Sequence, residues 1–428
     1  MNILHLNTYS LSKNKSFPHF NFHRDLLEDG HDSIIVSAKG DIIDDKIIIL
    51  EHSKILPFMF SAITRKFFFQ ILNKNDSNYY YPEWNLDNIK LADIINRVPF
   101  IPDVIITYWT KFAFNQKIIF ELSEYYDAPV LTLPVDMASF TGGCHFSGSC
   151  DKYKNSCGSC HILNSTRDND LSRRTLLFKK KYIDKTDLTM LVCSSVISSQ
   201  LSSSSLTKDI DQVPMLYTVD ETIFHPKGKA KARSHFKIPN NKKVIFFGAA
   251  NLNHPRKGMI YLIEALNILS SYSKESYSNK DIVLLIAGNK LEIQDIPFDY
   301  VSLGYLEHEH ELASAYRACD VFACPSIEDA GPLMINQSIM SGRPVVAFNM
   351  GDDPDLVLNG KTGYVADIKD SRDFSMGLHK ILSMSESEWK VSSFKCRELG
   401  LSRFSRRVNR IRLTEILSNL VKRKNKNL

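Results

Sequence analysis

Short apolar runs alternate along the chain with longer amphipathic stretches, and this alternation predicts an α/β fold. Residues 2–6 have the pattern of a buried strand, 18–28 that of a helix, and 31–37 that of a second strand. This β-loop-α-β opening is typical of a Rossmann-like domain, although its first loop contains no glycine. Further strands are predicted in the first half at 103–107, 130–133 and 188–193. Strands separated by helices favour a parallel sheet.

The second half starts the same pattern again. A strand at 243–247 leads through a polar loop at 248–258 into another predicted helix. Later, a strand at 321–325, a helix at 331–341 and a strand at 345–348 follow one another with short connections. A strand–helix–strand unit of this kind belongs to a parallel sheet, and ligands of such sheets bind where the strands end.

Each half of the chain starts with a β-loop-α-β pattern typical of nucleotide-binding domains. This repetition predicts two Rossmann-like domains that face a cleft. The 428 residues allow two domains of about 200 residues each. We expect an N-terminal domain at 1–212 and a C-terminal domain at 213–400. The segment 388–420 is expected to be helical. The C-terminal helix, placed at 401–428, is expected to pack back on the first domain.

One aromatic and basic segment, 54–74, does not fit this repeat. It reads KILPFMFSAITRKFFFQILNK and predicts a helical insertion. A helix packed within the fold is one interpretation, and an apolar face that contacts a membrane or a lipid-like acceptor is the other.

The net charge of +5 is small for this length and does not indicate a nucleic-acid-binding protein. Basic clusters such as 179–181 and 422–426 fit solvated helix faces, or contacts with phosphate or an anionic membrane surface. The N-terminus has no signal-peptide pattern, and no run of about 18 apolar residues occurs. We therefore expect a cytoplasmic protein, either free or peripheral on the inner face of the plasma membrane.

Four of the eight cysteines lie within the stretch GGCHFSGSCDKYKNSCGSCH. Cys144, Cys150, Cys157 and Cys160 follow a C-x5-C-x6-C-x2-C pattern. In a cytoplasmic protein this grouping favours a structural zinc site with four thiolate ligands over disulfides, with an iron–sulfur cluster as the alternative. His145 and His161 flank the group and are spare ligand candidates if one cysteine is not used.

Two charged loops in the second half are candidates for ligand binding. Arg256 and Lys257 precede Gly258 at a loop–helix junction. Two adjacent cations there suit a diphosphate, since the Arg guanidinium presents a planar fork of N–H donors and the Lys ammonium a point charge. Glu328 and Asp329 lie at the start of the 331–341 helix, and such side chains accept hydrogen bonds from sugar hydroxyls. Solvated surface charge is the alternative interpretation of both loops.

These stretches resemble family 4 retaining glycosyltransferases, which have two Rossmann-like domains (the GT-B architecture). The second half carries the resemblance in FFGAANLNHPRKGMIYLIEAL, ACDVFACPS, EDAGPLMINQSIMSGRPVVAF and GDDPDLVLNGKTGYVA. The first half, with FTGGCHFSGSCDKYKNSCGSC and DLSRRTLLFKKK, resembles the cysteine-containing branch that makes surface polysaccharides of the colanic-acid or O-antigen kind.

The resemblance implies transfer, with retention, of a sugar from a UDP- or GDP-sugar to a lipid-linked oligosaccharide. It implies that Arg256 and Lys257 hold the donor diphosphate and that Asp329 or Glu328 contacts the transferred sugar. It further implies that Gln337 contacts the ribose of the nucleotide. No catalytic metal is needed in this architecture, because cations and N–H groups stabilise the leaving group.

The same resemblance makes the helix N-terminus at Gly331, Pro332 and Leu333 part of the donor site. In the first half, Asp136 is the catalytic candidate, in a loop where the branch often has a histidine and this chain has Val135.

Gln337 stands where the family usually has a second glutamate. Together with Val135 and the glycine-poor first loop, this substitution supports an alternative function. The protein would then be a catalytically impaired, glycosyltransferase-like scaffold that binds a nucleotide sugar without turnover.

Overall fold

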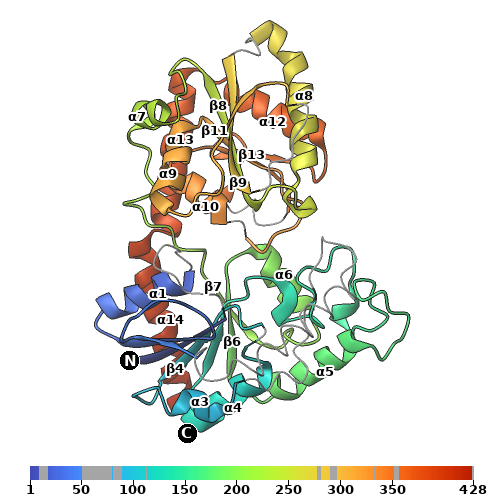
Figure 1. Cartoon of the computed structure of the whole chain (residues 1–428), viewed down its shortest axis with the longest axis vertical. Helices are drawn as coiled ribbons and strands as arrows, with labels where there is room; N and C mark the ends of the chain where they lie inside the picture. The colour runs from blue at the N-terminus through green and yellow to red at the C-terminus, as the bar shows by residue number, and fades with distance from the viewer. Residues whose placement is uncertain are drawn as a thin grey trace. The chain divides into compact units, whose positions relative to one another are not determined.

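The chain folds into two α/β units, which confirms the predicted architecture of two Rossmann-like domains. The computed structural model describes residues 1–8, 18–50, 80, 89–111, 113–276, 281–289, 296–331, 333–350 and 356–426. One unit comprises Met1–Met215 with Arg410–Leu428, and the other comprises Leu216–Asn409 (Figure 1). The predicted helical insertion at 54–74 lies outside the described residues.

The described part of the first unit forms a seven-stranded parallel sheet in the order β3-β2-β1-β4-β5-β6-β7. Its strands are β1 (Asn2–Asn7), β2 (Asp32–Ser37), β3 (Ile47–Ile49), β4 (Val104–Thr107), β5 (Val130–Thr132), β6 (Leu188–Val192) and β7 (Asp211–Pro214). Its helices are α1 (Pro18–Glu28), α3 (Leu91–Ile95), α4 (Gln116–Tyr126), α5 (Leu171–Ile183), α6 (Ser195–Ser203) and α14 (Arg406–Lys426), with short 3-10 turns η2 (Met137–Ser139) and η3 (Lys152–Lys154).

The second unit has the same strand order in its six-stranded described sheet, β10-β9-β8-β11-β12-β13, again parallel. Its strands are β8 (Lys243–Asn251), β9 (Ile282–Asn289), β10 (Asp299–Ser302), β11 (Val321–Cys324), β12 (Val345–Phe348) and β13 (Gly363–Ala366). Its helices are α7 (Lys229–His235), α8 (Met259–Ser276), α9 (Glu309–Ala318), α10 (Leu333–Met340), α12 (Ser371–Leu382) and α13 (Glu386–Arg403), and η4 (Pro255–Lys257) is a 3-10 turn.

The central strand β8 shows why this sheet carries helices on both faces. Its residues alternate between two cores, with Val244 and Phe246 in one and Ile245 and Phe247 in the other. The first core packs on α9, α10 and α13, and the second on α8 and α12 (Figure 1). A strand that is buried on both sides must be apolar throughout, which is the pattern the sequence shows.

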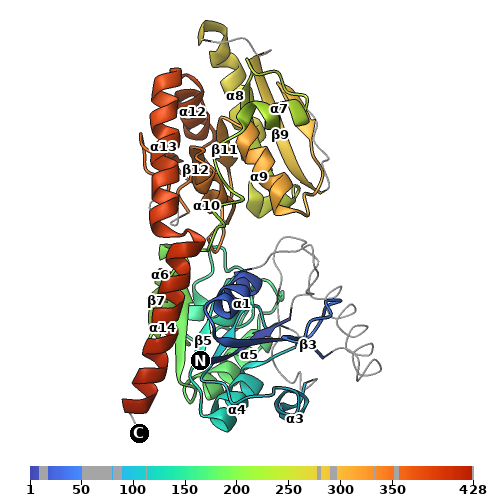
Figure 2. The ribbon, with the colours of Figure 1, turned by 90° about the vertical axis from the view of Figure 1, so that its left-hand side faces the viewer.

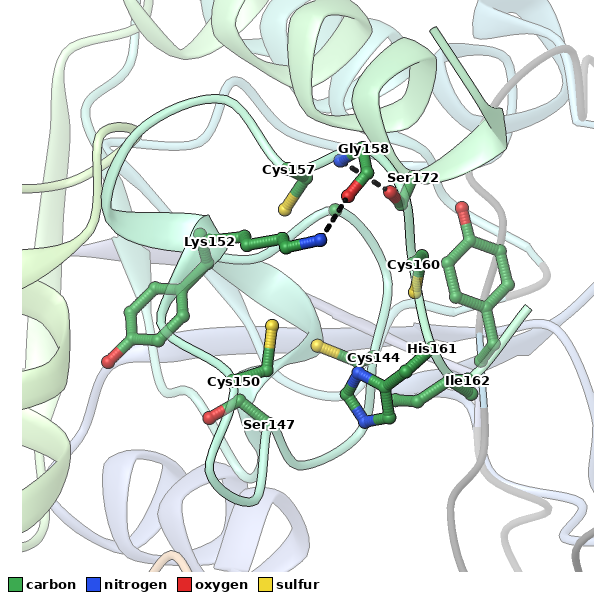
Figure 3. A pocket seen from close by; sticks show the side chains of 13 residues that line it. Cys144, Ser147, Cys150, Lys152, Cys157, Gly158, Cys160, His161, Ile162 and Ser172 are labelled. Atoms are coloured by element: carbon green, nitrogen blue, oxygen red, sulfur yellow. Dashed lines mark hydrogen bonds between the residues drawn. The ribbon is translucent and has the colours of Figure 1, made fainter. Parts of the chain in front are cut away.

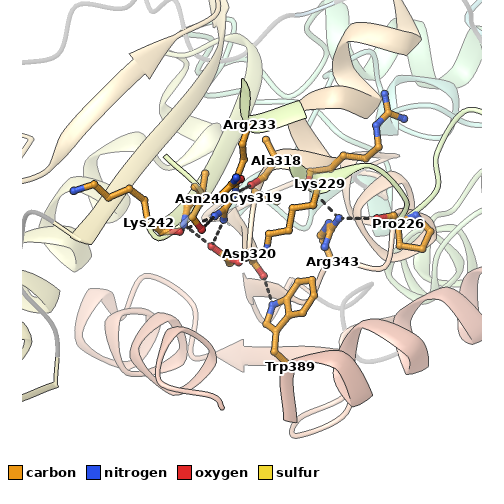
Figure 4. A network of polar contacts seen from close by, with 12 residues as sticks. Pro226, Lys229, Arg233, Asn240, Lys242, Ala318, Cys319, Asp320, Arg343 and Trp389 are labelled. Atoms are coloured by element: carbon orange, nitrogen blue, oxygen red, sulfur yellow. Dashed lines mark hydrogen bonds and ion pairs between the residues drawn. The ribbon is translucent and has the colours of Figure 1, made fainter. Parts of the chain in front are cut away.

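A buried ion network fixes the start of β11 in the second unit. Asp320 pairs with Lys229 (Oδ1–Nζ 2.5 Å) and Arg233 (Oδ2–Nη2 2.8 Å), and it accepts the N–H of Val244 (2.7 Å) (Figure 4). Trp389 donates to the Asp320 carbonyl (2.9 Å), and the Lys229 ammonium lies over its ring. Burial favours the neutral acid, but the two cations hold the pKa of Asp320 below its ordinary value.

The last helix of the chain contacts the first unit. Arg410 pairs with Glu28 (2.8 Å) and Asp29 at the end of α1, and Arg423 pairs with Asp187 (2.5 Å) and Asp211 (2.7 Å) beside β6 and β7 (Figure 2). Residues 410–428 accordingly belong to the first compact unit, whose division from the second falls after residue 215.

The segment 388–420, predicted to be helical, is divided between two helices, α13 and α14. Helix α13 ends at Arg403 and α14 begins at Arg406. Phe404 between them is fully buried, and its carbonyl accepts the N–H of Val219 (3.1 Å). A tertiary contact therefore breaks a stretch that has helical composition on both sides.

No helix among the described residues is long and apolar enough to cross a membrane.

Candidate functional site

The second sheet reverses its strand order between β8 and β11, and the loops after these strands carry the charged residues singled out in the sequence. β9 lies on one side of β8 and β11 on the other. In parallel α/β sheets the carboxyl ends at such a reversal form a ligand-binding crevice. The loop after β8 contains Arg256 and Lys257 in η4, and the loop after β11 contains Glu328 and Asp329.

Gly258 allows these two loops to pack directly on each other. Its φ of +71° favours glycine, and a Cβ atom built there would lie 1.7 Å from the carbonyl oxygen of Pro325. Two residues away in each loop, the N–H of Ile327 donates to the carbonyl of Arg256 (2.9 Å). The backbone contacts fix the cations of one loop opposite the acids of the other.

The carboxylate of Asp329 lies between both cations. Its Oδ2 atom is 2.5 Å from Lys257 Nζ and 3.0 Å from Arg256 Nη1, and its Oδ1 atom accepts the N–H of Ala330 (2.9 Å). Arg256 Nη1 also donates to the carbonyl of Glu328 (2.7 Å). The side chains of Arg256, Lys257 and Asp329 are 15%, 25% and 14% exposed, so solvent screens the cluster only in part.

The cluster holds Asp329 ionised. Burial disfavours the charged carboxylate, but Lys257, Arg256 and the hydrogen bonds to it outweigh burial and lower the pKa of Asp329 to about 2. In this state one internal anion already neutralises part of the two positive charges. An incoming diphosphate must therefore share these cations with Asp329 or displace it.

The helix that follows, α10, contributes a buried amide. Gln337 is 6% exposed, and its Oε1 atom lies 3.4 Å from the hydroxyl of Tyr316, which donates to the carbonyl of Met334 (2.9 Å). Gly331 and Leu333 flank the helix start and are half-buried, and Pro332 lies outside the described residues. The predicted contact of Gln337 with a ribose stays a prediction.

In the first unit, Asp136 is the centre of a polar cluster in the loop after β5. Its Oδ1 atom caps η2 by accepting the N–H of Ala138 (2.7 Å). Its Oδ2 atom lies 2.9 Å from Nδ1 of His145 and accepts the indole N–H of Trp109 (3.2 Å). Asp136 is 2% exposed, whereas the His145 side chain is 20% exposed. His145, predicted as a spare metal ligand, is thus the partner of Asp136.

A buried lysine holds the same loop in place. Lys179 of α5 is 1% exposed and donates to the carbonyls of Ala138 (2.5 Å) and Thr141 (3.0 Å). The sequence pattern places Lys179 in a basic cluster expected on a solvated helix face or at an anionic surface, and its burial corrects that prediction. A signal was present, because Lys179 continues the buried stripe of α5 formed by Ser172, Thr175 and Leu176.

The four clustered cysteines line one small cavity in the first unit (Figure 3). Burial raises the pKa of Cys144 to about 12 and that of Cys157 to about 11, so both thiols are neutral at pH 7 without a cation. Among the described residues, no three His, Cys, Asp or Glu side chains are arranged as a ready metal site. The remaining cysteines are buried separately, at Cys193, Cys319, Cys324 and Cys396.

Sequence comparison gives a family match in the second unit. Residues 241–384 match the family described as "Glycosyl transferases group 1". A D-inositol 3-phosphate glycosyltransferase of Stackebrandtia nassauensis is 27% identical over 176 residues, which cover 39% of either chain. An Escherichia coli UDP-Gal:alpha-D-GlcNAc-diphosphoundecaprenol alpha-1,3-galactosyltransferase is 25% identical over 167 residues, which cover 37% of this chain and 42% of the relative. The matches thus span less than half of these relatives.

Structure comparison covers nearly the whole chain. Sucrose-phosphate synthase from Thermosynechococcus elongatus superposes with a TM-score of 0.67 at 14% identity, covering 98% of this chain and 99% of the other. Anabaena HepE in complex with UDP and glucose gives a TM-score of 0.62 at 13% identity with the same coverage. At such identities the likeness establishes the fold, which is that of GT-B glycosyltransferases.

Proposed function

We propose that the protein is a retaining glycosyltransferase that moves a sugar from a nucleoside diphosphate sugar to a lipid-linked oligosaccharide in surface polysaccharide synthesis. The observation that carries the proposal is the Arg256–Lys257–Asp329 cluster at the strand-order reversal of the second sheet. The cluster lies inside the stretch that matches group 1 glycosyl transferases.

The chemistry of the two cations supports a diphosphate donor. Arg256 offers a planar fork and Lys257 an ammonium with three donor hydrogens, and both suit phosphate oxygens. When the bond from the sugar to the diphosphate breaks, negative charge grows on the leaving phosphate. Fixed cations in a partly buried loop stabilise that charge and lower the barrier. HepE, of the same fold, has been solved with UDP and with UDP-glucose.

Carboxylates in the loop after β11 are the candidates for contact with the reacting sugar. In this proposal Asp329, with Glu328 beside it, accepts hydroxyl hydrogen bonds from the sugar once the diphosphate takes over the cations. Asp136, in the loop after β5, is a further candidate for a catalytic role. The lipid-linked acceptor is supported by the E. coli relative, whose name specifies a diphosphoundecaprenol acceptor.

A nucleotide panel tests the proposal. Purified protein is heated with UDP- and GDP-sugars, and one of them should raise the melting temperature and yield a transfer product with a lipid-linked acceptor. Lys257→Ala should abolish the stabilisation, because the diphosphate loses a cation in contact with it. Lys390→Ala is the matched control, since this lysine is 68% exposed on α13. The absence of stabilisation by every nucleotide contradicts the proposal.

The second candidate is a scaffold that binds a nucleotide sugar without turnover. It is favoured by Gln337, which supplies no charge and lies buried against Tyr316. Nucleotide binding without transfer, across a panel of acceptors, would support the scaffold. A single clear transfer product would exclude it.

A further inference from the structure

The cysteine cavity of the first unit plays no part in the proposed reaction, yet four cysteines line it. Cys144, Cys150, Cys157 and Cys160 come from separate turns of one loop and line a single cavity (Figure 3). All four are unbridged thiols. Four thiols gathered from 17 residues of sequence form a donor set that soft divalent metals prefer.

The backbone around the last two cysteines is held in an unusual conformation. Cys157, Gly158 and Ser159 have consecutive φ values of +53°, +100° and +44°. A left-handed conformation at Cys157 and at Ser159 costs about 1 kcal/mol or more at each residue. Gly158 is required there, because a Cβ atom would lie 2.2 Å from the carbonyl of Asp168. The fold thus accepts backbone strain to bring Cys157 and Cys160 to the same cavity.

Hydrogen bonds hold the turn that carries the last two cysteines. The N–H of Gly158 donates to Oγ of Ser172 (3.0 Å), and the N–H of Cys160 donates to Oδ2 of Asp170 (2.8 Å). The ammonium of Lys152 donates to the carbonyls of Gly158 (3.3 Å) and Ser159 (2.8 Å). These contacts keep Cys157 and Cys160 at the wall of the cavity.

The same loop is tied to the cluster around Asp136. The N–H of Met137 donates to the carbonyl of His145 (3.0 Å), and the hydroxyl of Thr141 donates to the carbonyl of Cys144 (3.1 Å). A cross-link between the cysteines would therefore restrain the residues that orient Asp136 and His145.

We propose that Cys144, Cys150, Cys157 and Cys160 bind one Zn²⁺ ion as thiolates and that this ion is a structural cross-link for residues 136–161. Each thiol releases its proton to solvent as the ion binds, and the side chains turn within the cavity to complete a tetrahedral site. All four positions are then filled by protein, so the ion has no open position for catalysis.

Metal analysis of the full-length protein tests the site. The wild-type protein should contain one equivalent of zinc after purification under reducing conditions. Cys150→Ser and Cys157→Ser should lose it, and Cys193→Ser, which removes a buried thiol outside the cavity, should keep it. Wild-type protein without stoichiometric metal, or with disulfides among the four cysteines, overturns the proposal.

Cobalt substitution keeps the test informative if a serine variant fails to fold. Wild-type protein stripped with a chelator and titrated with Co²⁺ should develop the absorption bands of a tetrahedral thiolate complex at one equivalent. Stripping should also expose residues 136–161 to limited proteolysis, and added Zn²⁺ should reverse this. A titration without such bands would refute thiolate ligation.

These measurements do not depend on the proposed transferase activity. They read out metal content, cobalt spectra and protease sensitivity, and none of them requires a nucleotide. Failure of the zinc site would leave nucleotide binding by the second unit untouched, and the reverse also holds.

Discussion

The ion pairs of Asp329, and the lowered pKa that results from them, are properties of the folded site that its sequence position alone does not show. The sequence predicts Arg256, Lys257 and Asp329 as site residues separately, because each lies in a loop at a strand end. Their ion pair joins residues more than 70 positions apart in sequence, and no local pattern encodes such a pairing. With a pKa of about 2 against an ordinary 3.8, Asp329 adds stability above pH 3.8 that is lost as the pH falls toward 2.

We expect Asp329→Asn to bind UDP more tightly than the wild type. The variant removes the internal anion that competes with the diphosphate for Arg256 and Lys257. A gain of up to about tenfold, equivalent to about 1.4 kcal/mol, is a reasonable upper bound for one partly screened charge. Calorimetric titration with UDP measures it, and Glu328→Gln controls for the loss of a neighbouring negative charge. Weaker UDP binding by Asp329→Asn would show that the carboxylate does not compete with the ligand.

A buried histidine in the first unit gives a second prediction at the scale of single residues. His23 is hydrogen-bonded to Ser33 (Nδ1–Oγ 2.7 Å), which in turn contacts His5 (2.9 Å). Burial lowers the pKa of His23 from 6.5 to about 4. The unfolded chain therefore binds more protons than the folded one between these values, and stability falls as the pH drops from 6.5 to 4, by about 3 kcal/mol at most.

Denaturant unfolding at several pH values between 4 and 7 checks this expectation. His23→Gln should flatten the pH dependence of the free energy of unfolding, because the titrating group is gone. His235→Gln, at an exposed position of α7, should leave the dependence unchanged. An equally steep loss of stability in His23→Gln would assign the effect to other groups.

At the scale of elements, the sequence predicts strands better than helix ends. Buried strands such as β8 and β11 stand out because they are apolar on both faces. The break between α13 and α14 does not, since its local signal is Ser405 alone, which accepts the N–H of Val408 (3.3 Å) as the N-cap of α14, and other serines lie inside α13. The break depends on burial of Phe404 and on its hydrogen bond to Val219, which only the folded unit supplies.

The contact between the two loops of the candidate site can be tested through Gly258. We expect Gly258→Ala to weaken nucleotide binding and to destabilise the second unit, because its Cβ atom would collide with the Pro325 carbonyl. Gly360→Ala is the matched control: Gly360 has a φ of +72°, but nothing lies within 4 Å of its Cβ position. The control isolates backbone strain, about 1 kcal/mol. Thermal unfolding and UDP binding measure both variants, and equal effects would mean that the close approach is unimportant.

At the scale of the whole molecule, the repeated β-loop-α-β pattern was enough to predict two parallel sheets. Their common strand order does not follow from this repetition, since the right-handed crossover rule fixes only the hand of each connection and other doubly wound orders obey it too. The polar networks were not predictable in the same way. Asp320, Lys229 and Arg233 meet from separate segments, and the cluster of Asp136, His145 and Trp109 depends on a loop that Lys179 anchors. Such networks depend on tertiary proximity, whereas the sheets follow from local hydrophobic patterning.

The C-terminal helix α14 is attached to the first unit by two kinds of contact, ion pairs and buried apolar side chains. From Arg410 onward, α14 offers exposed ion pairs as well as the buried side chains of Leu413 and Leu417. We expect Leu417→Ala to lower the free energy of unfolding of the first unit by about 2–5 kcal/mol, since this side chain is fully buried. Arg423→Ala should cost less than about 1 kcal/mol, because its partners are exposed and screened by solvent. Denaturant unfolding of both variants decides between the two contributions. A larger loss in Arg423→Ala would mean that charge, and not apolar burial, attaches the helix to the first unit.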